Sequence, residues 1–176
     1  MTQNDAAMGG VDAFIAGVSR YAMDHYTGRL HQHAFIHAVA DDYAFIRVRD
    51  ITRPVRFLRQ MEGAPPLTLG TAGFRPDLVD DANPARHYTA FVFVGYWLPR
   101  PLAVLTLWLW EMAGFVRYGG VWSANDMASG RTGIRHGAWV RRLGPEVLPG
   151  LIAAELAAHP ATVGDADDAS TLSPAA

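Results

Sequence analysis

The segment from Tyr88 to Val116 constrains the fold of this chain more than any other part of the sequence. Its residues are almost all apolar, except for Pro-Arg-Pro at residues 99–101 and one acid, Glu111. Proline ends a helix because it lacks a backbone N–H and clashes with the preceding turn. Each half is also well short of the roughly 20 residues that a membrane-spanning helix needs. The segment therefore predicts two apolar helices joined by a tight turn, which we expect to form a central buried hairpin.

The composition is that of a core-rich globular protein. Half of the 176 residues are hydrophobic, 18% are charged and the formal net charge is -2. Nucleic-acid binding is not expected, because phosphate groups favour a basic surface. The absence of cysteine excludes disulfides and thiolate metal ligands. Residues 1–14 lack the basic and apolar regions of a signal peptide, so we expect a cytoplasmic protein, with a membrane-peripheral location or export as an effector as alternatives.

Helical periodicity recurs on both sides of the hairpin. Apolar residues at spacings of three and four indicate helices at residues 11–22, 35–46, 53–61 and 146–158. A short strand at residues 43–51 and a break of the last helix at Pro149-Gly150 are alternatives that periodicity does not decide. Residues 62–83 form instead a stretch rich in Pro, Gly and Thr without sustained periodicity. A loop of this length is uncommon inside a compact domain, and we expect it to wrap around the helices.

The predicted fold class is all-α. The segments form a single helical domain at residues 10–159, with five to seven helices and the apolar hairpin at its centre. Residues 1–9 and 160–176 are rich in small and polar side chains. Such segments bury too little apolar surface to fold, so we expect disordered tails.

Two helix starts are marked by capping residues. Asn83 and Pro84 predict the start of the first hairpin helix, with Asn83 as N-cap and Pro84 at the first helical position. Ser123 is followed three residues later by Asp126, which has the form of a capping box. A further helix is therefore expected to begin just after Ser123.

The helix after Ser123 carries a stripe of glycines. Gly130, Gly133 and Gly137 share one face with Asp126, at positions i, i+4, i+7 and i+11 counted from the acid. Glycine costs roughly 1 kcal/mol in a helix interior. Three glycines on one face therefore predict the close approach of a neighbouring backbone.

Glu111 is the most informative single residue. It lies in the run LWLWEMAGF, where no helical face is polar, so its carboxylate is expected to be buried and to need a cation or hydrogen-bond donors. A tight turn at residues 98–101 sets the two hairpin helices side by side. His87 and Glu111 then lie at nearly the same distance from the turn, measured along the helix axes. We therefore expect Arg86 and His87 to meet Glu111, and Asp126 to join them from the glycine-striped helix.

The cluster of His87, Glu111 and Asp126 has two open interpretations. In the functional one, these three candidate catalytic residues bind a divalent metal or supply acid and base groups. In the structural one, they form a buried network that ties three helix ends together. Further candidate binding residues are Arg86, Tyr88, Ser123, Arg131 and His136.

A second group of ligand-type residues lies in the run HQHAFIHAVADD. His33, His37 and Asp41 stand at i, i+4 and i+8 on one helical face, and two histidines at this spacing can bind one zinc ion. A solvated helix face explains the same pattern without a metal. The cofactor, if there is one, is not identified by these patterns.

Residues 73–137 carry a recurring pattern of short motifs. These are GFRPDLVDDANPARHY, then Gly95-Tyr96, Glu111, and SANDMASGRTGIRHG. The pattern resembles that of uncharacterised bacterial helical proteins, some of them at the ends of secreted or polymorphic-toxin-like chains. The resemblance implies a helical architecture and carries no established chemistry. The family has Asn-Gln where this chain has Asn83-Pro84, and Phe in place of Tyr88.

Three functional hypotheses follow. The first is a helical binding or interaction protein with a structural polar cluster, whose partner is another protein or a second copy of the chain. The second is a hydrolase-like bacterial effector that uses His87, Glu111 and Asp126, with a metal as an option. The third is an accessory subunit of a membrane complex that docks through the apolar hairpin, although membrane association is not the favoured interpretation.

Overall fold

The computed structural model describes residues 9–24, 29–47, 65–117, 119–120 and 122–158. This part of the chain contains six α-helices, one 3-10 helix and no strand, so the predicted all-α single domain is confirmed. The helix predicted at residues 53–61 and most of both predicted tails lie outside the described residues. The elements are α1 (Gly10–Asp24), α2 (Arg29–Ala44), η1 (Pro76–Leu78), α5 (Pro84–Trp97), α6 (Arg100–Arg117), α7 (Ala124–Leu143) and α8 (Val147–Glu155).

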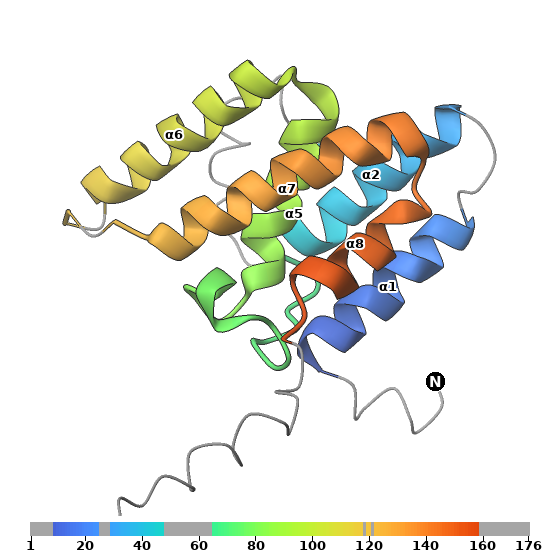
Figure 1. The fold of residues 1–176 in the computed structure, drawn as a ribbon, viewed down its shortest axis with the longest axis horizontal. Helices are drawn as coiled ribbons and strands as arrows, with labels where there is room; N and C mark the ends of the chain where they lie inside the picture. The colour runs from blue at the N-terminus through green and yellow to red at the C-terminus, as the bar shows by residue number, and fades with distance from the viewer. Residues whose placement is uncertain (1–8, 25–28, 48–64, 118, 121, 159–176) are drawn as a thin grey trace, which may run out of the picture.

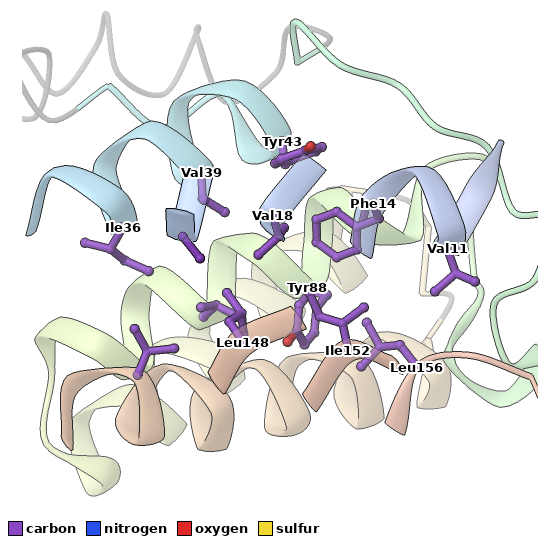
Figure 2. Packing of buried hydrophobic residues seen from close by; sticks show 14 of the residues in the cluster. Val11, Phe14, Val18, Ile36, Val39, Tyr43, Tyr88, Leu148, Ile152 and Leu156 are labelled. Atoms are coloured by element: carbon purple, nitrogen blue, oxygen red, sulfur yellow. The ribbon is translucent and has the colours of Figure 1, made fainter. Parts of the chain in front are cut away.

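Helix α5 lies at the centre of the molecule, between α2 and α7, and α1 packs against α8 and α2 (Figure 1). The main core fills the space between these helices (Figure 2). The Phe14 ring from α1 makes edge-to-face contacts with Tyr43 from α2 at 4.9 Å and with Tyr88 from α5 at 5.9 Å. Edge-to-face aromatic contacts add to the free energy of apolar burial.

The glycine stripe of α7 packs directly against the backbone of α5. A Cβ atom at Gly133 would lie 2.6 Å from the carbonyl oxygen of Tyr88, and one at Gly137 would lie 2.1 Å from that of Val92. The contact is reciprocal, because a Cβ atom at Gly95 of α5 would lie 2.2 Å from the carbonyl oxygen of Ile134. The predicted close approach of a neighbouring backbone is therefore confirmed, and that neighbour is α5.

Helix α6 lies at the edge of the molecule (Figure 1), so the prediction of a central buried helix at residues 102–116 is wrong. Among the side chains of α6 that the structure describes, residues 100–116, only Ala103, Leu107 and Glu111 are buried. The α5–α7 contact already occupies the centre, and α6 covers only the small second core beside it. None of the described helices is long and apolar enough to cross a membrane. The exposed large apolar residues of α6 are Leu102, Leu105, Trp108, Leu109, Trp110, Met112, Phe115 and Val116.

The described part of the long loop, residues 65–83, connects the ends of several helices. The backbone N–H of Gly10 in α1 donates to the Leu69 carbonyl at 2.8 Å. At the other side of the loop, the Arg75 N–H donates to the Leu156 carbonyl after α8, also at 2.8 Å. The described part of the loop therefore lies across the ends of α1 and α8, and it ends where α5 begins.

Candidate site of His87, Glu111 and Asp126

The first turn of α5 positions His87. Pro84 occupies the first helical position, as predicted, and the Arg86 N–H donates to the Asn83 carbonyl at 3.0 Å. Asn83 stands at the N-cap position, but its side chain makes no capping hydrogen bond. Its backbone N–H donates instead to the Asp81 carboxylate at 2.7 Å. The start of the helix was predicted correctly, whereas the capping bond was not.

The first turn of α7 positions Asp126. The Ser123 hydroxyl oxygen accepts from the Asp126 N–H at 2.9 Å, which confirms the predicted cap. Gly130 lies one turn further along α7, and a Cβ atom there would lie 3.2 Å from Nε2 of His87 and 2.5 Å from a methyl group of Leu107. The missing side chain at Gly130 thus makes room for the imidazole between α6 and α7.

Three helices bring His87, Glu111 and Asp126 together. Nε2 of His87 lies 3.7 Å from Oε1 of Glu111, and Nδ1 lies 3.9 Å from Oδ1 of Asp126. One ligand atom from each residue lies within 4.8 Å of the other two. The equal level of His87 and Glu111 that the sequence predicts is therefore present, with the imidazole between the two acids.

The cluster is largely buried but open on one side. The exposed fraction of the side chain is 13% for His87, 9% for Glu111 and 28% for Asp126. Nε2 of His87 is buried and has no hydrogen-bond partner within the described residues. Nearly all buried polar atoms in proteins have a partner, so this nitrogen is available to a ligand, as is the equally unpartnered Nε2 of His136. Solvent reaches the cluster on the side of Asp126.

Burial shifts the ionisation of all three groups. It lowers the pKa of His87 to about 4, so the imidazole is neutral near pH 7. Burial raises the pKa of Glu111 to about 7, and the nearby charge of Asp80 adds to this effect. Burial also raises the pKa of Asp126, together with the negative charges of Asp80, Glu111 and Asp81. The carboxylates therefore repel each other, and a cation between them would relieve that repulsion.

Asp80 and Asp81 belong to the acidic environment of the site, and the sequence interpretation missed them. Both are exposed and lie in the loop before α5, and the nearby carboxylates of both raise the pKa of Asp126. The signal was available, because two adjacent acids directly precede the predicted helix start. Their charge gives the open side of the site a negative potential.

The donor set fits a divalent cation. One imidazole nitrogen and two carboxylates are ligands that Zn²⁺, Mn²⁺ and Fe²⁺ accept. Ligand atoms around one such ion lie roughly 3–4 Å apart when each metal–ligand bond is about 2.0–2.2 Å. The separations of 3.7 and 3.9 Å start from different nitrogens of the imidazole, Nε2 and Nδ1, and one ion can bind only one of them. With one atom taken from each residue, the three ligand atoms lie within 4.8 Å of one another, so binding one ion requires the side chains to rotate closer together.

Comparison with protein-family models, with curated proteins and with solved structures finds no match. The resemblance to a bacterial helical family stays a prediction.

Two of the predicted binding residues form a separate buried chain. The Tyr88 hydroxyl lies 2.8 Å from Nδ1 of His136, and Nε2 of His136 lies 3.2 Å from Oε1 of Glu155. His136 is ten residues beyond Asp126, about 15 Å along the helix axis. Tyr88 and His136 therefore lie away from the cluster and connect α5, α7 and α8.

The remaining predicted binding residues lie at the starts of α5 and α7 or further along α7. Ser123 caps α7, Arg86 is half-buried beside His87 in the first turn of α5, and Arg131 is exposed on α7.

The second predicted metal group is not assembled. Nδ1 of His33 lies 2.8 Å from the Tyr96 hydroxyl, and the Asp41 carboxylate accepts from Nε of Arg47 at 2.8 Å. His37 packs its ring against Trp97. Within the described residues, the only group of three whose ligand atoms converge is that of His87. The spacing of His33, His37 and Asp41 was correct for one helical face, but their side chains have other partners.

Proposed function

We propose that this protein binds a divalent cation through His87, Glu111 and Asp126 and is a metal-dependent hydrolase. The observation that carries this proposal is the buried, unpartnered Nε2 of His87, which lies 3.7 Å from one of two acids with raised pKa values. A purely structural network would satisfy its buried polar atoms. This cluster leaves a nitrogen unpaired, as the Tyr88–His136–Glu155 chain also does, and in addition it sets two acids with raised pKa values side by side.

The arrangement suits hydrolysis because the protein supplies three ligands and leaves part of the site open. Catalytic metal sites commonly combine three protein ligands with a position for water or substrate. A bound cation would supply Lewis acidity and would lower the pKa of a bound water. The 28% exposure of Asp126 marks the side from which substrate would enter.

Glu111 is suited to hold and release a proton. A general acid or base works best when its pKa lies near the working pH, and burial raises the pKa of Glu111 to about 7. Its carboxyl group lies on the inner face of α6, with its side chain only 9% exposed. In the free protein, Glu111 and Asp126 are therefore both suited to exchange protons with a water in the site, since burial raises the pKa of Asp126 to about 7 as well.

Cation binding is the first test. Chelator-treated protein is titrated with Mn²⁺ and Zn²⁺, and binding is followed by calorimetry and by the rise in Tm. We expect Glu111→Gln and Asp126→Asn to weaken binding by at least tenfold, since each removes a charged ligand. Asp12→Asn is the matched control, because Asp12 also lies in the first turn of a helix but is exposed on α1.

Hydrolysis is the second test, made with ester and phosphodiester probe substrates in the presence of the bound ion. Turnover that is lost in Glu111→Gln while the fold is retained would support the proposal. Variants that bind the cation as tightly as the unmodified protein would refute it, and the cluster would then be structural.

An interaction protein is the second candidate function. It is favoured by the exposed apolar face of α6, where Leu109 is 62% exposed and Val116 is 77% exposed. The two functions are compatible, since Glu111 faces inward from the same helix. An effector role is what the resemblance to toxin-like chains implies for either of them.

A further inference from the structure

The outward face of α6 carries an apolar seam with the spacing of a coiled coil. The seam consists of residues at i, i+3, i+7, i+10 and i+14, which is the a/d pattern of two heptads. Their exposed fractions range from 47% to 77%. The residues of this seam are Leu102, Leu105, Leu109, Met112 and Val116.

The seam lies opposite the face by which α6 packs on its own chain. At about 100° per residue, the buried residues Ala103, Leu107 and Glu111 point roughly half a turn away from the seam. Glu111 is also the only ionisable residue between the two ends of α6. The outward face of this helix therefore contains no charge between Arg100 and Arg117.

Side chains of different size border the seam. Trp108 and Phe115 lie on one side and contact Trp122, with ring centroids 5.4 and 6.4 Å from it. Thr106 and Ala113 lie on the other side, at the corresponding heptad positions. Large residues along one border and small ones along the other allow a second helix to approach closely.

We propose that α6 packs against α6 of a second copy of this chain, so that the seam forms the interface of a homodimer. The five seam residues, with Trp108, Phe115 and Trp122, are 37–77% exposed. At these exposed fractions, the eight side chains together present on the order of 800 Å² of apolar surface to solvent. One partner contributes about this area to a standard interface. Monomers rarely expose a contiguous apolar patch of this size.

Charge favours a second copy over a lipid surface. A helix that lies on an anionic membrane carries Lys and Arg along its polar face, whereas α6 has Arg only at its two ends. The positions that border the seam are also uncharged, and charges at these positions normally select a different partner chain. A second copy meets the seam without repulsion between like charges.

The mass of the protein in solution tests this proposal. We expect light scattering and sedimentation to give twice the chain mass of 19.2 kDa at micromolar concentration. Leu109→Glu should shift the protein to a monomer while its circular dichroism is retained. Leu143→Glu is the matched control, because Leu109 and Leu143 are both leucines that are 62% exposed, the second at the end of α7.

The same experiment identifies the alternatives. A monomer at 100 µM would overturn the proposal, and so would a dimer that persists in Leu109→Glu. A monomer that binds vesicles containing anionic lipid, with binding lost in Leu109→Glu, would assign the seam to a membrane. None of these outcomes depends on the cation site, so the two proposals can fail separately.

Single cysteines report on the interface directly, because the chain has no cysteine of its own. We expect Leu105→Cys, Leu109→Cys or Met112→Cys to form an intermolecular disulfide under mild oxidation, and Leu143→Cys to form none. Cross-linking at Leu105 and Met112 alike would indicate parallel helices. Cross-linking confined to Leu109 would indicate antiparallel ones. No cross-linking at any of the three positions would overturn the proposal.

Discussion

At the scale of single residues, the site combines groups that are unfavourable when separated from a ligand. His87 is held neutral by burial, while Glu111 and Asp126 are each made harder to ionise by burial and by neighbouring acids. Such opposed shifts are typical of functional sites, since a fold selected for stability alone would avoid them. Gly130 contributes by having no side chain, because the His87 ring uses the space that a Cβ atom would fill.

The pH dependence of stability reports on Glu111. Its pKa is about 7 in the folded protein and 4.5 as the ordinary value, so its neutral form stabilises the fold below about pH 4.5. This contribution is lost as the pH rises through 7. Gln resembles the neutral form, so metal-free Glu111→Gln should be more stable than the unmodified protein at pH 8 by on the order of 2 kcal/mol, with little difference at pH 4.5.

Unfolding in urea with chelator present, at pH 4.5 and pH 8, measures this difference. Glu146→Gln serves as the control, because Glu146 is exposed and its replacement should leave the pH dependence unchanged. An equal effect of Glu111→Gln at both pH values would mean that the carboxyl group is not destabilised by burial.

At the scale of elements, the α5–α7 contact determines where everything else lies. Gly133 and Gly137 of α7 and Gly95 of α5 allow the two backbones to touch. This contact places His87 and Asp126 on facing helices and leaves α6 at the edge. A larger residue at any of these positions would push apart the two helices that carry the candidate ligands.

Gly137→Ala tests the contact. The new Cβ atom would lie 2.1 Å from the Val92 carbonyl oxygen, and a backbone atom cannot move aside alone. We expect the free energy of unfolding to fall by about 3 kcal/mol or more, as for other overpacked interiors.

Gly150→Ala is the control, since Gly150 lies in α8 with nothing within 4 Å of the new atom. This variant should stabilise the fold by up to about 1 kcal/mol. Equal stability of the two variants in chemical denaturation would contradict the close contact.

At the scale of the whole molecule, the sequence predicts the geometry within and between neighbouring helices better than it predicts which helix faces are buried by other elements. The cap at Ser123, the glycine contact and the shared level of His87 and Glu111 follow from spacing along single helices or across one tight turn. The exposure of α6 does not, because a helix that is apolar all round has the same pattern whether its own chain or another covers it. The contact between Tyr88 and His136 depends on how α5 crosses α7, and no local pattern encodes that angle.

The two proposals predict a linkage between cation binding and dimerisation. Within its own chain α6 is held by few buried residues, among them Ala103 and Leu107, so a partner on the seam should hold Glu111 in place. We expect monomeric Leu109→Glu to bind Mn²⁺ about tenfold more weakly than the dimer. Because the dimer has two cation sites, saturating Mn²⁺ should then tighten the dimer by about a hundredfold, the square of that factor. Calorimetry on the monomer and the dimer measures the Mn²⁺ affinity, and sedimentation with and without Mn²⁺ measures the dimerisation constant. Equal affinities in the monomer and the dimer would exclude the linkage.

The two faces of α6 also have a consequence for control in the cell. A helix that presents one ligand inward and needs a second copy outward makes activity depend on how much of the protein is present. Under both proposals, the chain below its dimerisation constant would bind the cation about tenfold more weakly, and a rise in expression would restore the tighter binding. Abundance would then act as the regulator, without a separate inhibitor or a modifying enzyme.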